Sequence, residues 1–123
     1  MKGVYALVLK IEKGFSCSIG HLGNVRFNVG TYIYVGSALN SLEKRIQRHI
    51  QKTKKIHWHI DHLTTSKCVS VEKILYLKTN SKKECILSQE IANLSDSRPI
   101  KNFGSTDCRS ACPSHLYYFP LKS

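Results

Sequence analysis

Hydrophobic and polar residues alternate in short runs along much of this chain, a pattern typical of β-strands. The first run, Val4–Ile11, is largely apolar at both odd and even positions, so its strand should be central and covered on both faces. Later runs rich in β-branched and aromatic residues predict further strands at Ser16–Gly20, Val25–Asn28, Thr31–Val35, Val69–Leu77 and His115–Phe119.

The pattern changes to helical spacing after Thr31–Val35. Asn40 and Glu43 form a capping-box pair, which makes Asn40 the expected N-cap. Arg45 and His49 follow one turn apart, on a stripe next to the apolar face. The residues expected to be buried on that face are Leu42, Ile46 and Ile50.

A second capping box, Ser81 with Glu84, predicts a helix that ends near Leu94. The histidine-rich segment 57–63 should form a short helical turn or an irregular connection. The predicted order is therefore strands, helix, strand, helix, strand. This order indicates an α+β fold with a small, mostly antiparallel central sheet flanked by helices, in one domain over residues 1–123.

The composition adds a large excess of positive charge. The 123 residues include 19 Lys and Arg against 8 Asp and Glu, which gives a formal net charge of +11. On charge alone this surplus favours polyanionic partners, nucleic acid (DNA or RNA) first and an anionic membrane surface second, with a merely solvated surface as the competing interpretation. No stretch is long and apolar enough to span a bilayer, so no membrane partner is expected. An odd number of cysteines without a secretory leader favours the cytoplasm.

Two tyrosines stand in mirrored glycine tripeptides, Gly3-Val4-Tyr5 and Tyr34-Val35-Gly36. Either tyrosine alone would be a packing residue of a strand. Adjacent antiparallel strands would bring the two phenols side by side. Arg45, held near the sheet by its buried neighbours, could bind a phosphate and offset transition-state charge. His49 could contact the same phosphate or be purely structural.

Glu90 falls between Ile86 and Leu94 on a helical wheel, inside the apolar arc of the second helix. A buried carboxylate needs a partner, which could be Arg45, a lysine or a divalent cation. One carboxylate with waters and phosphate oxygens suits Mg²⁺ or Mn²⁺. A buried ion pair without chemistry is the alternative.

Two clusters contain residue types that bind metals, but neither has a well-defined spacing. His57 and His59, with Asp61 and His62 nearby, could hold zinc, contact phosphate or assist proton transfer. The tail contains Cys-x3-Cys-x2-His, only three strong zinc ligands, so buried free thiols are the competing interpretation. The residues of this possible zinc site are Cys108, Cys112 and His115.

Taken in order, these motifs resemble the core of the GIY-YIG nuclease superfamily over about Val4–Asn102. The motifs are Gly3-Val4-Tyr5, Tyr34-Val35-Gly36, Leu42-x-x-Arg45-x-x-x-His49 and Glu90. Nearly the whole chain is also similar to a mostly archaeal, poorly characterised branch of that superfamily. That similarity rests on Tyr34-Val35-Gly36-Ser37-Ala38, Arg48-His49, His57-Trp58-His59-Ile60-Asp61, Phe103-Gly104-Ser105 and Asp107-Cys108.

The resemblance implies a three-stranded antiparallel sheet flanked by helices and metal-dependent hydrolysis of DNA, one strand per active site, on substrates that could include branched or damaged DNA. Tyr5 would activate or position water, Tyr34 would orient the phosphate or base, and Arg45 would stabilise the phosphorane. His49 takes a place where the family carries His or Tyr, and Glu90 would hold one Mg²⁺ or Mn²⁺. His57 or His59 could match a second family histidine, and Asn102 the distal family asparagine.

The basic residues of the first helix and its C-terminal run are expected to contact nucleic acid. They are Lys44, Arg48, Lys52, Lys54 and Lys55. Two other functional classes remain open beside the endonuclease. One is a non-catalytic basic nucleic-acid-binding module with the same fold. The other is a zinc-stabilised adaptor, which only the Cys108, Cys112 and His115 group supports.

Overall fold

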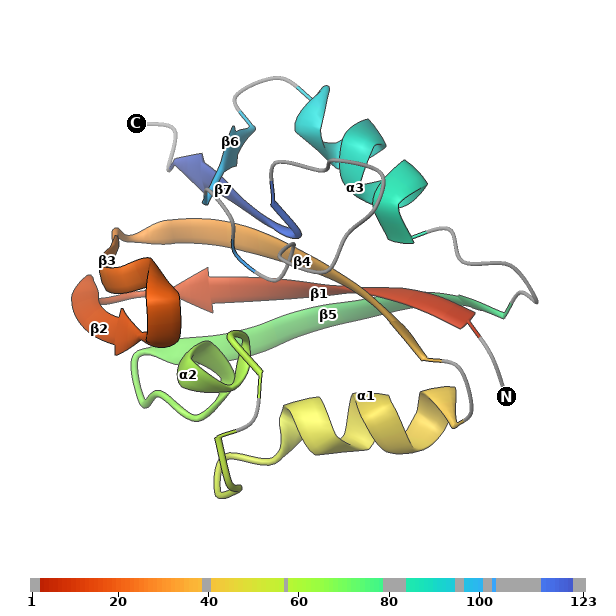
Figure 1. Ribbon diagram of the computed structural model, residues 1–123, viewed down its shortest axis with the longest axis horizontal. Coiled ribbons are helices and arrows are strands. Elements are labelled where there is room, and N and C mark those ends of the chain that lie inside the picture. The colour runs from red at the N-terminus through yellow and green to blue at the C-terminus, as the bar shows by residue number, and fades with distance from the viewer. Residues whose placement is uncertain are drawn as a thin grey trace.

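A five-stranded antiparallel sheet lies at the centre of the molecule, with helices on both faces (Figure 1). This computed structural model describes residues 3–38, 41–56, 58–78, 84–94, 97–100, 103 and 114–120, with the side chains of residues 21, 84–86 and 88 left out. The strand order is β5-β1-β4-β7-β6. The strands are β1 (Gly3–Ile11), β4 (Gly30–Ala38), β5 (Val69–Lys78), β6 (Arg98–Pro99) and β7 (Leu116–Pro120).

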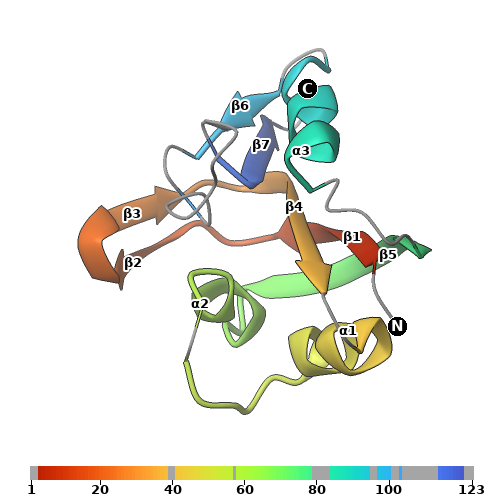
Figure 2. The ribbon, with the colours of Figure 1, turned by 45° about the vertical axis from the view of Figure 1, so that its right-hand side comes forward.

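The helices divide between the two faces of the sheet. Helices α1 (Leu42–Ile50) and α2 (Asp61–Thr64) lie on one face, and α3 (Glu84–Ala92) lies on the other, as Figures 1 and 2 show from two directions. A separate hairpin of β2 (Phe15–Ile19) and β3 (Gly23–Phe27), joined by a 3₁₀ turn over Gly20–Leu22, connects β1 to β4. The predicted α+β fold with a mostly antiparallel sheet is confirmed.

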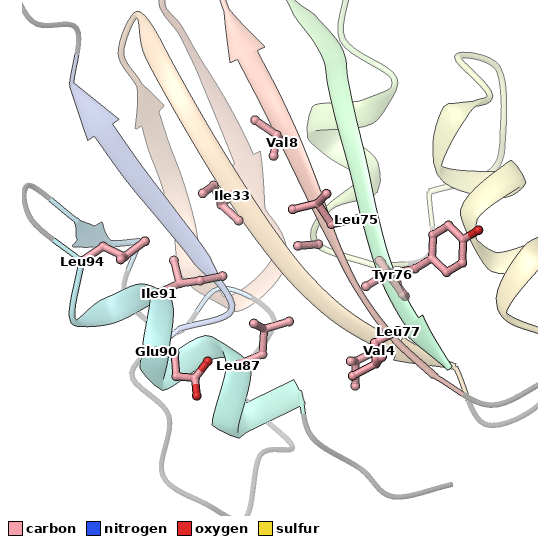
Figure 3. A pocket seen from close by; sticks show the side chains of 12 residues that line it. Val4, Val8, Ile33, Leu75, Tyr76, Leu77, Leu87, Glu90, Ile91 and Leu94 are labelled. Atoms are coloured by element: carbon pink, nitrogen blue, oxygen red, sulfur yellow. The ribbon is translucent and has the colours of Figure 1, made fainter. Parts of the chain in front are cut away.

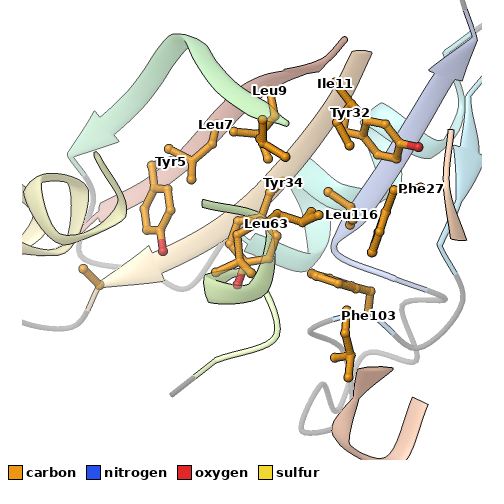
Figure 4. Close-up of a cluster of buried hydrophobic side chains, with 14 of the residues drawn as sticks. Tyr5, Leu7, Leu9, Ile11, Phe27, Tyr32, Tyr34, Leu63, Phe103 and Leu116 are labelled. Atoms are coloured by element: carbon orange, nitrogen blue, oxygen red, sulfur yellow. The ribbon is translucent and has the colours of Figure 1, made fainter. Parts of the chain in front are cut away.

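Strand β1 is central, as its two apolar faces predicted. It pairs with β4 on one side and with β5 on the other. Its odd-numbered residues join the main core under α1 and α2, where they pack with tyrosines of β4 and with Phe103 (Figure 4). Val4 and Ala6 are buried on the opposite face, the face of α3. The core residues that β1 contributes are Tyr5, Leu7, Leu9 and Ile11.

The two tyrosine–glycine motifs meet in the register between β1 and β4. Tyr5 lies directly opposite Gly36, and Leu7 lies opposite Tyr34, so the two phenols are diagonal neighbours on one face. A Cβ atom on Gly36 would lie 2.9 Å from Cε2 of Tyr5 and closer still to its Cζ and Oη. The Tyr5 ring therefore occupies the space that a side chain at position 36 would need.

Helix α1 differs from the prediction in its start and in its buried face. Its N-cap is Ser41, whose side chain accepts a hydrogen bond from the Lys44 backbone N–H at 3.3 Å, while the predicted cap Asn40 lies outside the described residues. Ile50 was expected to be buried but is 52% exposed. His49 is fully buried in its place, because the imidazole finds a hydrogen-bond partner on β1.

Several element boundaries also differ from the sequence prediction. Helix α3 is described from Glu84 and ends at Ala92, two residues before the predicted end, and its predicted cap Ser81 lies outside the described residues. The short strand β6 was not predicted, because two residues that include Pro99 carry no alternation. Strand β5 extends one residue beyond its predicted end, to Lys78.

We predict that Gly36→Ala destabilises the protein by about 1–3 kcal/mol, because the new methyl group overlaps the buried Tyr5 ring. Urea unfolding of the variant and the wild type measures the difference. Ser70→Ala, a change at an exposed position of β5, is the matched control and should leave the unfolding free energy within about 0.5 kcal/mol. Equal stability of Gly36→Ala and wild type would contradict the close packing of Tyr5 on Gly36.

Candidate active site

His49 is the centre of a buried cluster that joins β1, β4 and α1. Its Nε2 atom lies 2.7 Å from the hydroxyl oxygen of Tyr5, and both residues are almost completely buried. The imidazole centroid is 6.1 Å from the Tyr34 ring, in an edge-on arrangement, and 5.9 Å from the Trp58 ring. The structure therefore brings together three of the four predicted catalytic residues, with Tyr5 and Tyr34 both next to the His49 imidazole.

The environment of His49 keeps its imidazole neutral. Burial, with a smaller contribution from the positive charge of Lys54, lowers the pKa of His49 to about 4. The Nδ1 atom is buried and has no hydrogen-bond partner within the described part of the chain. Buried polar atoms usually have partners, so an imidazole with one unused nitrogen beside two phenols marks a candidate functional site.

Arg45, the fourth predicted catalytic residue, forms the rim of this cluster. Its Nη1 donates a hydrogen bond to the backbone carbonyl of Ser37 at 3.1 Å, which holds the side chain against the end of β4. Its guanidinium carbon lies 4.5 Å from the centroid of the Trp58 ring, a cation–π contact. The guanidinium is partly exposed and has further N–H donors, so it can bind an anion from solvent.

The buried carboxylate of Asp61 stabilises the segment that connects α1 to α2. The carboxylate is fully buried and accepts two hydrogen bonds from Arg48, at 2.8 and 2.9 Å, and one from the backbone N–H of Trp58 at 2.9 Å. The bond to Asp61 raises the pKa of Arg48. The Arg48 guanidinium also lies 4.4 Å from the Trp58 ring centroid, so Asp61 positions the indole against the basic face of α1.

The five basic residues predicted to contact nucleic acid differ in the hydrogen bonds that they form within the protein. Lys52 donates to the carbonyls of Ser66 and Val69, and Lys54 donates to the carbonyls of Arg48 and His49 at the end of α1. Burial lowers the pKa of both lysines. These two lysines and Arg48 therefore hold parts of the fold together, although Lys52 is itself exposed, as Lys44 and Lys55 are. A role of any of the five in nucleic-acid binding stays a prediction.

The expectation that Glu90 shares a pocket with the phenol hydroxyls, His49 and Arg45 is wrong. Glu90 is exposed on α3, on the opposite face of the sheet from α1, as Figure 3 shows. Helix α3 packs on the sheet through Leu87 and Ile91, while Leu94 is 54% exposed. The apolar arc is narrower than the wheel suggested, and Glu90 lies at its border.

The other candidate ligands do not form a metal centre among the described residues, where no group of three or more His, Cys, Asp and Glu could hold an ion. His59 is partly buried, with its ring centroid 5.4 Å from that of Phe103, and His62 contacts the Cys17 thiol at 3.6 Å. His115 is 4% exposed. The candidates that lie outside the described residues are His57, Asn102, Cys108 and Cys112.

Sequence reasoning did not predict the contacts of Trp58 and Asp61 with the arginines of α1. Both belong to the motif His57-Trp58-His59-Ile60-Asp61, but the histidines of this motif suggested metal binding. The useful signal was an aspartate that comes before a short apolar turn and thirteen residues after an arginine on a basic helix. Such an acid can accept a bidentate bond from the arginine and a bond from a preceding backbone N–H at the same time.

A family model, the domain of unknown function DUF123, matches residues 4–123. The chain belongs to this family. The match covers the whole sheet and every residue of the His49 cluster, so the cluster lies within the DUF123 domain and not in an appended segment. Neither a comparison with curated proteins nor one with solved structures gives a match. Among the described residues, no helix has the length and apolar character needed to cross a membrane.

We predict that His49 makes the stability of this DUF123 protein depend on pH. Its folded-state pKa is lowered to about 4 from 6.5, so its contribution is complete above pH 6.5 and is lost as the pH falls toward 4. Between pH 7 and pH 5 the loss is about 2 kcal/mol. Urea unfolding at the two pH values should show this loss in the wild type and not in His49→Gln, once the shared loss from other groups is subtracted. An identical loss in both proteins would contradict a buried neutral imidazole.

We also predict that Asp61→Asn lowers the unfolding free energy by about 3 kcal/mol, because the carboxylate that accepts both Arg48 bonds and the Trp58 N–H is lost. Chemical denaturation measures the change. Glu43→Gln, on the exposed face of α1, is the control and should change it by less than about 0.5 kcal/mol. An Asp61→Asn protein as stable as the control would show that the Arg48–Asp61 pair is not needed for folding.

Proposed function

We propose that the protein binds nucleic acid on the α1 face and hydrolyses phosphodiester bonds there, as an endonuclease of the GIY-YIG type acting on DNA. The observation that carries the proposal is the buried hydrogen bond between Tyr5 and His49, at 2.7 Å, next to Tyr34 and below Arg45. Four residues that the motifs selected from separate parts of the sequence converge on one face of the sheet. A purely structural role would not require this combination of two phenols, an imidazole and a partly exposed guanidinium.

Each residue has a role that its surroundings support. Arg45 is the accessible cation of the cluster, so it would bind the phosphate and stabilise the negative charge of the transition state. Tyr5 and His49 share one proton in a water-poor environment. His49 is neutral at physiological pH, because burial lowers its pKa to about 4, so it can accept a hydrogen bond from the Tyr5 hydroxyl and orient that hydroxyl, which would position the attacking water. Tyr34, 9% exposed, would orient the phosphate or a base.

The described residues do not fit a divalent metal ion at this cluster. Glu90 is on the other face of the sheet, and the oxygens of Asp61 accept bonds from Arg48 and Trp58. Should cleavage require Mg²⁺ or Mn²⁺, its carboxylate ligand would have to be sought among the acids whose side chains lie outside the described residues. These are Asp96 and Asp107, because Glu84, whose side chain is also left out, belongs to α3 on the far face of the sheet.

A non-catalytic nucleic-acid-binding module is the second candidate. The observation that favours it is the burial of the side chains that would act in catalysis, since Tyr5 is 2% exposed and His49 is fully buried. The exposed groups near them, Arg45 and Trp58, are suited to phosphate contact and base stacking without chemistry. Cytoplasmic localisation and an effect on branched or damaged DNA remain part of the proposal and not of the observations.

Cleavage of plasmid and branched DNA tests the proposal. We expect nicking by the wild type, and a decrease of about 10²–10³-fold in Arg45→Ala and Tyr5→Phe, because each variant loses a group that acts on the transition state. Lys67→Ala, at an exposed position just before β5, is the control and should cleave like the wild type. Assays with Mg²⁺, Mn²⁺ and a chelator determine whether a metal ion is needed, and Glu90→Ala tests the acid on the far face.

Binding measurements distinguish the two candidates. Both predict an affinity that falls with salt concentration, and Arg45→Ala should reduce the salt slope by about 1. Salt-dependent binding without cleavage in any metal condition would favour the binding module. Cleavage that persists unchanged in both Tyr5→Phe and Arg45→Ala would show that the His49 cluster is not the active site.

A further inference from the structure

The outer edge of β5 is open, and its side chains are unusually apolar for an edge. Strand β5 is the outermost strand of the sheet, and within the described residues no strand pairs with its outer side. Its last part carries exposed Leu75, Tyr76 and Leu77, at 55%, 61% and 57%. The opposite edge, β6, has only two residues, one of them Pro99, which protects it from further pairing.

An apolar cavity of about 580 Å³ lies beside this edge, on the α3 face of the sheet (Figure 3). Leu75 and Leu77 line it from β5, Leu87 and Ile91 line it from α3, and Leu94 lines it from just after the end of that helix. Glu90 is the charged residue among the described residues that line it. The edge and the cavity together form one surface of exposed apolar groups with a single carboxylate, in a chain whose net charge is +11.

We propose that this surface binds a second copy of the chain, through antiparallel pairing of the two β5 strands about a two-fold axis at Leu75. An irregularity in the β1–β5 register at Val8 and Leu9 leaves Glu72 without a partner on β1, so the regular part of the edge begins at Lys73. In the proposed register, Lys73 lies opposite the partner's Leu77. Ile74 then lies opposite the partner's Tyr76, which covers the exposed phenol side chain with an aliphatic one.

Charge complementarity favours a second copy over an unrelated partner. Lys73 pairs with Val8 on β1, and Leu75 pairs with Ala6, so both side chains point to the cavity face. Opposite the partner's Leu77, the Lys73 ammonium would lie at the mouth of the partner's cavity, close to the carboxylate of the partner's Glu90. The two-fold axis repeats this pair, so one strand provides both the cation and the surface that receives it.

The same geometry limits the assembly to two copies. Pairing of the two β5 edges uses the long edge that is open in the described part of each copy's five-stranded sheet, and Pro99 interrupts the opposite edge. The contact uses both faces of β5, with Leu75 and Leu77 on the cavity face and Tyr76 on the face of the His49 cluster, opposite Tyr5. Its test is separate from that of the proposed function, because the association is measured without nucleic acid. Since each copy carries a charge of +11, salt should strengthen the association by screening repulsion, whereas it weakens nucleic-acid binding.

Sedimentation equilibrium of the full chain, without nucleic acid, tests the proposal. The mass should rise from 14.0 kDa toward twice that value at concentrations of about 100 µM, with more dimer at higher salt. Leu75→Lys should remove the dimer, because it places two like charges on the axis. Ser70→Lys adds a charge to an exposed position of the same strand before the irregularity, and should leave the dimer intact. Circular dichroism confirms that both variants fold.

A charge exchange tests the orientation of the two copies. Lys73→Glu and Glu90→Lys should each weaken the dimer by about tenfold or more, and the double variant should restore it. A monomer at every concentration and salt would overturn the proposal and leave this edge to a different partner. A dimer that persists in Leu75→Lys, or single charge variants without rescue by the double variant, would overturn the β5 contact as well.

Discussion

The packing of the Tyr5 ring across Gly36 is the constraint on which the rest of the site depends. The two residues face each other between β1 and β4, and the absence of a side chain at position 36 lets the ring lie there with its hydroxyl directed at α1. His49 is fully buried on α1 because it forms a hydrogen bond with the Tyr5 hydroxyl, whereas its neighbour Ile50 is exposed. The orientation of the helix, and with it the position of Arg45, follows from this one contact between strands.

The sheet separates two surfaces of different chemistry. On the face of α1, a neutral imidazole, two phenols and an indole lie under guanidinium groups, and the exposed groups include lysines. On the face of α3, the cavity is apolar and its charge is the carboxylate of Glu90. Alternation along β1 produces this separation, since Tyr5 and Leu7 point to one face while Val4 and Ala6 point to the other. A polyanion and an apolar partner could therefore bind at the same time.

Much of the fold could be predicted from the sequence, because strand alternation and helical spacing are local signals. The central position of β1 and the side-by-side phenols followed from the apolar faces of Val4–Ile11 and the paired motifs. The buried face of α1 could not be predicted from helical spacing. His49 is buried where Ile50 was expected to be, because it forms a hydrogen bond with Tyr5, 44 positions earlier in the chain. Glu90 was misplaced for a related reason: a helical wheel shows which residues share a face, but not which side of the sheet the helix covers.

The way the positive charge is distributed explains why a net charge of +11 alone says little about binding. Arg48, Lys52 and Lys54 donate to Asp61 or to backbone carbonyls, so these cations order the connection that follows α1. Releasing them to bind a phosphate would leave buried acceptors without donors, which is unfavourable. Arg45 also donates to a carbonyl, but its planar group has donors left over and lies partly exposed against Trp58. Arg48 and its partner Asp61 hold the indole in place, and the indole in turn holds Arg45 where a phosphate can reach it.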